Sequence, residues 1–175
     1  ATLDVIESGG VRFPSKRVMD ILEAHGATVD RSTHIAKIPG HVVEVSLKLA
    51  PPTYTLAARD PSLDLPLDGQ HSYLGTDGCG VEVMDAFTGE RHRSTLQDVA
   101  DIATLADYLD AIAFHWVPVS AQDKPKETRS LHELHAIWNH STKHVQTESI
   151  VNEREAIVSI EMAAAIAGGR DELRR

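Results

Sequence analysis

The sequence predicts an α/β protein in which a small α+β unit precedes the first βα units of a larger parallel sheet or barrel. Up to about residue 93, short apolar runs alternate with Gly, Pro and Asp turn signals, as in short strands and hairpins. After that point, helical patterns alternate with nearly continuous apolar runs, which are typical of strands in parallel sheets. We therefore predict two domains, residues 1–93 and residues 94–175.

The elements of the first domain follow from helix caps and helix breakers. Ser15 can cap an apolar helical pattern, and Gly26 has the conformational freedom to end it. Pro51 ends a second helical pattern because it lacks the amide that a helix needs. The predicted elements are, in order, the helix between Ser15 and Gly26, a strand over 34–38, a turn at Pro39-Gly40, the helix before Pro51-Pro52, a strand over 54–58, a turn over 60–62, and β structure over 65–93 with turns at Asp68-Gly69 and Thr88-Gly89.

The second domain is predicted to contain one helix followed by two βα units. Its elements are a helix capped by Ser94 or Thr95 with an apolar stripe (Leu96, Val99, Ile102, Ala103, Leu105, Ala106, Leu109), a strand over 111–119, a helix over 128–140, a strand over 144–151 and a helix over 152–167. A complete (β/α)₈ barrel takes about 250 residues, and about 65 residues follow Asp110. We therefore expect the sheet to be incomplete, in a chain cut from a longer protein.

Composition and charge argue against several classes of protein. The net charge of −9 is the opposite of the basic face that nucleic acids require. No apolar run approaches the roughly 18–20 residues of a membrane span, and no signal-peptide pattern opens the chain. The single cysteine, Cys79, cannot form an internal disulfide and fits a reducing cytoplasm. We expect a cytoplasmic protein that binds neither nucleic acid nor membrane.

The stretch HSYLGTDGCGVEVMD (residues 71–85) has a G-x-x-G-x-G spacing at Gly75, Gly78 and Gly80. A nucleotide-binding loop would need a helix N-terminus directly after the glycines, because its free N–H groups hold the phosphate. An alternating strand pattern over 81–84 follows instead, without Gly-Lys-Ser/Thr. We therefore predict a glycine-rich turn inside a β-hairpin, where glycine permits positive φ or close backbone approach.

The other chemically distinctive residues have a structural interpretation beside the functional one. His132 and His135 could share zinc, but the HELH sequence is not H-E-x-x-H, and a polar rim on a half-exposed helix is favoured. Cys79 has no cation or helix N-terminus beside it in sequence, so a small turn residue is favoured over a reactive thiol. Large aromatic side chains such as Trp116 and Trp138 usually belong to the core, although such rings also bind quaternary ammonium groups. We predict no metal site.

Polar residues follow the two predicted parallel strands. Ser120, Gln122 and Asp123 come after the first strand, and Glu148 and Ser149 lie towards the end of the second. In barrels, residues just after the strand ends form the active face. These positions are therefore candidates for a binding site.

The chain resembles the N-terminal part of the trimethylamine methyltransferase family. The resemblance is carried in order by GVRFPSKRVMDILEAHGATVD (residues 10–30), by the segment from IPGHVVEV to LDAIAF (residues 38–114) and by VPVSAQDKP (residues 117–125). Within it, residues 71–85 are similar to a G-H-x-Y-x-G-x-x-G-like hairpin of the family. Cys79 departs from that pattern, where another small residue is expected, so a cysteine-specific role is not implied.

The resemblance implies an enzyme built on a TIM (β/α)₈ barrel, of which this chain holds an N-terminal α+β unit and the first βα units. Such enzymes transfer a methyl group from trimethylamine, or from a quaternary amine such as glycine betaine, to the cobalt of a partner corrinoid protein, in settings that include methanogenesis. The corrinoid is carried by the partner, so no cofactor bound directly to this chain is expected. The resemblance leaves homo-oligomerisation open, and the isolated fragment is expected to be inactive.

Position and motif together nominate a set of substrate-binding residues, while catalytic residues are not identified. The predicted substrate-binding residues are Tyr73, Thr76, Asp77, Gln122, Asp123 and Glu148. The alternative hypothesis is a non-catalytic α/β binding or oligomerisation module. A sheet covered completely by the chain's own helices would favour that alternative.

Overall fold

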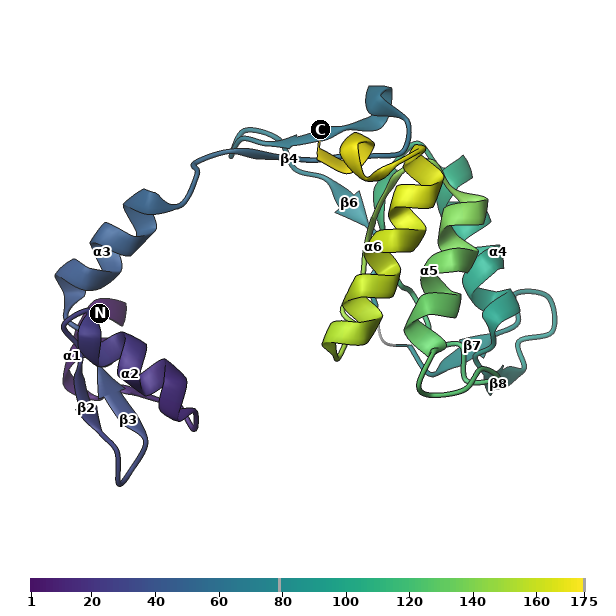
Figure 1. The fold of residues 1–175 in the computed structure, drawn as a ribbon. Coiled ribbons are helices and arrows are strands. Elements are labelled where there is room, and N and C mark those ends of the chain that lie inside the picture. The colour runs from purple at the N-terminus through teal and green to yellow at the C-terminus, as the bar shows by residue number, and fades with distance from the viewer. Residues whose placement is uncertain (79, 175) are drawn as a thin grey trace. The chain divides into compact units, whose positions relative to one another are not determined.

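A computed structural model describes residues 1–78 and 80–174, so the prediction made for Cys79 lies outside the described residues. The chain forms two compact units, residues 1–52 and residues 53–175 (Figure 1). The predicted boundary after residue 93 does not coincide with this division, because a strand before residue 93 pairs with one after it in the second unit. Within the described residues, no helix is both long enough and apolar enough to cross a bilayer.

The first unit packs three helices with a small antiparallel sheet of strand order β1-β3-β2. Its elements are α1 (Thr2–Ser8), β1 (Val11–Arg12), α2 (Lys16–Ala24), β2 (Thr28–Asp30), β3 (Ile35–Lys37) and α3 (Gly40–Leu49). The side chain of Ser15 accepts a hydrogen bond from Val18 N, which confirms the predicted cap. The predicted turn at Pro39-Gly40 is wrong, because Gly40 is already the first residue of α3. The short elements α1, β1 and β2 were not predicted.

The second unit contains two antiparallel hairpins beside its main sheet. The first pairs β4 (Tyr54–Leu56) with β5 (Leu65–Leu67), around the short 3₁₀ helix η1 (Pro61–Leu63). The second pairs β7 (Glu82–Met84) with β8 (Arg91–Arg93). Its turn is ordered by Asp85 Oδ1, which accepts hydrogen bonds from the amides of Phe87 and Thr88.

The main sheet has three parallel strands, not the two that the sequence predicted. Its order is β10-β9-β6, with β6 (Leu74–Gly75), β9 (Ile112–Trp116) and β10 (His144–Gln146) in parallel pairs. The helices α4 (Leu96–Tyr108), α5 (Arg129–His140) and α6 (Glu153–Ala167) follow these strands in turn and lie side by side (Figure 1). A 3₁₀ helix, η2 (Arg170–Arg174), comes after α6. The chain thus contains three consecutive βα units.

Alternation along β9 and the residues after it separates the two faces of the sheet. Val117 and Val119 pack with Val99 and Ala103 of α4 and with Ile137 of α5 in the apolar core. Side chains alternate along a strand, so Phe114 and Trp116 point to the face away from these helices. The predicted stripe of α4 is partly wrong: Ala100 is buried, whereas Leu105 is 58% exposed.

The glycine-rich stretch is a parallel neighbour of β9 and not a hairpin turn. A Cβ atom at Gly75 would lie 2.5 Å from Cζ of Phe114, and one at Gly78 would lie 2.6 Å from Cδ1 of Trp116. Gly80 forms a parallel bridge with Val119. Neither Gly75 nor Gly78 has a positive φ. Glycine is therefore required because this segment lies close to the rings of Phe114 and Trp116 on β9. The predicted need for close backbone approach is confirmed.

Candidate functional site

The carboxyl ends of the three parallel strands lie at one edge of the sheet, and we call this the carboxyl edge. It is formed by the described residues that continue from the strands, residues 76–78 and 80 after β6, residues 117–123 after β9 and residues 147–149 after β10. Ligands of open α/β sheets and barrels bind at this edge, because the loops there can vary without disturbing the sheet. The carboxyl edge is therefore the candidate functional site.

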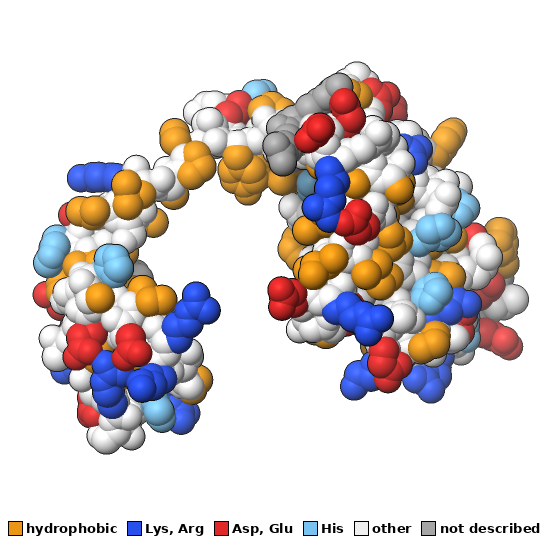
Figure 2. Space-filling view, in the orientation of Figure 1, with side chains coloured by type: hydrophobic (Ala, Val, Ile, Leu, Met, Phe, Trp, Pro, Cys, Tyr) orange, Lys and Arg blue, Asp and Glu red, His pale blue; other side chains and the backbone are white. Residues whose placement is uncertain are grey.

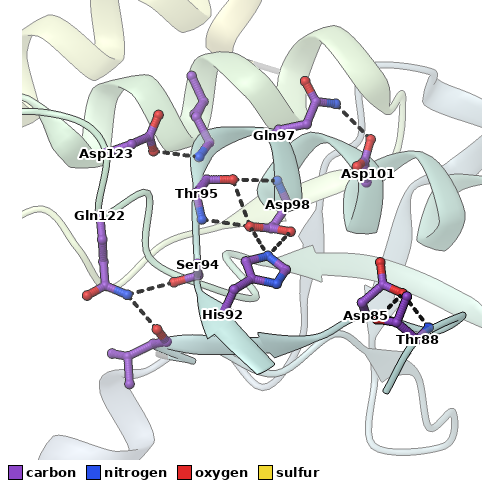
Figure 3. A network of polar contacts seen from close by, with 12 residues as sticks. Asp85, Thr88, His92, Ser94, Thr95, Gln97, Asp98, Asp101, Gln122 and Asp123 are labelled. Carbon is purple, nitrogen blue, oxygen red and sulfur yellow. Dashed lines mark hydrogen bonds and ion pairs between the residues drawn. The ribbon is translucent and has the colours of Figure 1, made fainter. Parts of the chain in front are cut away.

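Gln122 fastens the β7–β8 hairpin to the loop after β9. Its amide nitrogen donates to Val81 O and, over 3.0 Å, to Ser94 Oγ (Figure 3). Its amide oxygen accepts from Arg93 Nε at 3.1 Å and from Arg93 Nη2 at 2.6 Å. Ser94 Oγ in turn donates to Ser120 O at 2.6 Å. The structure therefore gives the Gln122 side chain a scaffolding role at this edge.

The N-terminus of α4 is capped from three directions at the same place. Asp98 and Thr95 form a capping box, in which Asp98 Oδ2 accepts from Thr95 N at 2.7 Å (Figure 3). His92 Nε2 donates to Asp98 Oδ1 at 3.1 Å, and Leu96 N donates to Asp123 Oδ1 at 2.7 Å. Burial opposes ionisation of Asp98 and of Asp123, but hydrogen bonds outweigh it and lower the pKa of both carboxyls. Asp123, in its ionised form, thus accepts the hydrogen bond from Leu96 N at the start of α4.

We expect Thr95→Ala to lower the free energy of unfolding by about 1 kcal/mol, because it removes the hydroxyl of the capping box. Urea unfolding followed by circular dichroism would measure the change. The matched control is Gln97→Ala, which removes only an exposed side-chain contact to Asp101 on the same helix and should stay within about 0.5 kcal/mol. Equal effects of the two substitutions would contradict the capping role.

Glu133 of α5 lies at the carboxyl edge and was not recognised from the sequence. Its side chain is 1% exposed. Oε1 accepts from Ala121 N at 2.7 Å and from Ser120 Oγ at 3.3 Å, and the hydroxyl of Ser149 lies beside the carboxylate, where it acts to lower the pKa. Burial raises the pKa of Glu133 above its usual range, although these donors and nearby Arg129 act against that shift. A detectable sequence signal existed, since Glu133 falls on the buried helical stripe of Leu134 and Ile137.

The remaining predicted substrate-binding residues lie before or after the strands β6 and β10. Tyr73 precedes β6, at its amino end, and its hydroxyl donates to Pro66 O at 3.1 Å. Thr76 Oγ1 accepts from Trp116 N at 2.8 Å, so this hydroxyl extends the pairing with β9. Asp77 is exposed and accepts from Gly78 N.

Glu148 is exposed and follows β10 at the carboxyl edge. The structure therefore brings Gln122 and Asp123 together, sets Glu148 after the neighbouring strand and leaves Tyr73 away from this edge. Their part in substrate binding stays a prediction.

The two α5 histidines of the HELH sequence, His132 and His135, are exposed on α5. Among the described residues there is no group of three or more His, Cys, Asp or Glu side chains that could hold a metal ion. Asn139 Nδ2 approaches His135 Nε2 to 3.2 Å, which gives this imidazole a neighbour on its own helix.

The opposite, amino edge of the sheet contains a cavity of about 310 Å³. Its lining combines apolar side chains of α5 and α6, among them Trp138 and Ile166, with polar groups that include Arg59 and His144. Arg59 Nη1 donates to Trp138 O at 2.6 Å, and His144 Nδ1 lies 2.6 Å from Ala57 O. These polar atoms are thus engaged with the backbone, and the cavity lies at the edge that serves stability in barrel proteins.

Comparison with known proteins identifies the family. The family model described as trimethylamine methyltransferase (MTTB) matches residues 1–175. This chain belongs to the trimethylamine methyltransferase family. The resemblance stated from the sequence is therefore confirmed.

Curated relatives of the trimethylamine methyltransferase family match almost the whole chain. It is 35% identical to trimethylamine methyltransferase MttB of Desulfitobacterium hafniense (strain DSM 10664 / DCB-2), over 99% of this chain and 35% of the relative. It is 29% identical to MttB1 of Methanosarcina acetivorans, over 100% of this chain and 36% of the relative. It is 27% identical to glycine betaine methyltransferase of D. hafniense (strain Y51), over 99% of this chain and 36% of the relative. The chain spans about a third of the length of these relatives.

Proposed function

We propose that this chain is part of a methyltransferase that moves a methyl group from a methylated amine to the cobalt of a partner corrinoid protein. The observation that carries the proposal is the match of the entire chain to the trimethylamine methyltransferase family. The relatives are named trimethylamine methyltransferase and glycine betaine methyltransferase. Both compounds in these names contain a methylated nitrogen. We therefore propose trimethylamine or a quaternary amine such as glycine betaine as the substrate class.

The carboxyl edge fits a reaction in which the protein binds and aligns without moving a proton. The reduced cobalt would supply the electron pair for the new carbon–cobalt bond, and a quaternary amine would leave as a neutral tertiary amine. Asp98 and Asp123, whose carboxyls have lowered pKa values, serve as ionised hydrogen-bond acceptors and not as acids. The carboxyl edge would supply fixed loops that align the amine and negative charge that stabilises the cation.

We propose further that the three βα units open a (β/α)₈ barrel. The strand order of the sheet follows the chain, β6, β9 and β10, as in a barrel, whereas a doubly wound sheet reverses its order at a switch point. Helices α4 and α5 pack on the same face, and Phe114 and Trp116 point to the other, which would be the barrel interior.

Apolar side chains on the outer surface of α6 also fit a barrel that continues beyond it. Ile157 is 50% and Ile160 is 51% exposed on this helix, and Figure 2 shows hydrophobic side chains gathered over it. A following helix would cover them.

The test uses the full-length protein, a reduced corrinoid protein as methyl acceptor, and trimethylamine, glycine betaine and related amines as donors. We expect the cobalamin absorbance to change from the reduced to the methylated form with at least one of these amines. The isolated residues 1–175 should give no such change. Absence of methyl-cobalt formation with every amine, in samples whose cobalt is demonstrably reduced, would refute the proposed reaction.

A further inference from the structure

We propose that Glu133 is a positioning residue, which fixes the loop after β9 and the loop after β10 relative to each other at the carboxyl edge. The inference rests on the proposed function, because it assigns these loops to the substrate site. It concerns one buried side chain on α5 that lies between the two segments. Glu133 accepts hydrogen bonds from Ser120 and Ala121 of the first loop, and the Ser149 hydroxyl of the second loop lies beside its carboxylate.

The packing of α5 against the sheet does not require a carboxylate at this position. Leu134 and Ile137, on the same side of the helix, are almost fully buried and supply the apolar contacts. Burying a charge is costly unless hydrogen bonds compensate for it. A carboxylate can accept several hydrogen bonds at once, so it can join two separate segments of backbone. Glu133 is therefore better explained by the loops that it joins than by helix packing.

The residues beside its partners give this junction a consequence for binding. Ser149 directly follows Glu148, the carboxylate that we predict to contact the cationic amine. Ala121 directly precedes Gln122, which fastens the β7–β8 hairpin. Glu133 thus connects the part of the edge that would carry the negative charge to the part that is rigidly braced.

The experiment compares Glu133→Gln with wild type in the full-length protein, by steady-state methyl transfer from glycine betaine or trimethylamine, whichever wild type uses. Glutamine has nearly the same shape and keeps an acceptor for Ala121 N, but it carries no charge, so its contacts with the Ser120 and Ser149 hydroxyls lose the strength that an ionised acceptor gives. We expect KM for the amine to rise about tenfold while kcat changes less than threefold. Since the positive charge on a quaternary nitrogen falls during transfer, its contact with Glu148 contributes mainly to substrate binding.

Two further variants separate positioning from a general loss of stability. Ser149→Ala removes the hydroxyl that lies beside the carboxylate in the second loop and should raise KM to a similar extent, and the double variant should show no additional loss. Glu153→Gln, an exposed carboxylate in the first turn of α6, is the matched control and should keep the wild-type KM. Should Glu133→Gln fail to fold, Ser149→Ala carries the test by itself.

Hydrogen exchange provides a readout that does not depend on activity. Glu133→Gln should increase amide exchange in residues 119–123 and 147–151 together, while exchange in α4 stays unchanged. An inactive wild type with this coupled change would reject the proposed function and retain the junction. Unchanged exchange, unchanged KM in an active enzyme, or additive effects of Glu133→Gln and Ser149→Ala would overturn the inference.

Discussion

Replacing Gly75 by alanine is expected to lower the free energy of unfolding by about 2 kcal/mol. The new Cβ would lie 2.5 Å from Cζ and 2.6 Å from Cε2 of Phe114, so the ring of the neighbouring strand must move. Forcing an extra carbon into a packed site costs about 1–3 kcal/mol. Alanine would recover about 0.4–1 kcal/mol by restricting the unfolded chain, which is less than the steric cost. Thermal unfolding followed by circular dichroism measures the difference.

Shortening the ring tests whether this contact is the cause. Phe114→Leu removes the atoms that the alanine methyl would meet, at the expense of some apolar contact. In a double-mutant cycle, Gly75→Ala should therefore cost clearly less in the Phe114→Leu background than in wild type. A neutral or stabilising Gly75→Ala substitution, or additive effects in the cycle, would contradict the role assigned to the glycine stretch.

The second large effect is a loss of stability in acid that depends on His115 of β9. This imidazole is 0% exposed, and neither ring nitrogen has a hydrogen-bond partner among the described residues. Burial, reinforced by Lys143 and partly offset by Asp107, lowers the pKa of His115 from 6.5 to about 4. The unfolded chain therefore binds this proton at higher pH than the folded chain does. Stability from this group is complete above pH 6.5 and falls as the pH drops from there to about 4.

The expected loss from His115 reaches about 3 kcal/mol at and below pH 4, since one pKa unit corresponds to about 1.4 kcal/mol. Urea unfolding of wild type and His115→Gln between pH 4 and 7.5 isolates it as a pH-dependent difference between the two proteins. The matched control, His132→Gln, changes an exposed imidazole on α5 and should keep the wild-type profile. Parallel profiles of wild type and His115→Gln would show that the buried imidazole does not determine the acid sensitivity.

The helices could be predicted where a side chain bonds to a nearby backbone amide. Ser15, Thr95 and Asn152 each accept from an amide three residues ahead, so their sequence context is sufficient. The strand β6 could not be predicted in its pairing, because it is two residues long and contains a glycine. Its partner is set by Phe114, almost forty residues later, through the room that Gly75 leaves for the ring.

The candidate site shows the same division between local and distant causes. Counting residues after the strand ends located the carboxyl edge correctly, but it could not show where side chains are directed. Gln122 and Asp123 are directed towards the hairpin and α4, and these contacts involve residues about thirty positions earlier. Glu133 was overlooked because the two histidines around it suggested metal binding. In the structure, Glu133 belongs to the buried side of α5.

The most direct test of the proposed site is a crystal structure of the full-length protein with its methylated amine bound. We expect the amine at the carboxyl edge, in contact with the loops at residues 117–123 and 147–149, with the hydrogen bonds to Glu133 intact. Finding the amine instead in the cavity at the amino edge, beside Arg59 and His144, would contradict this placement of the site.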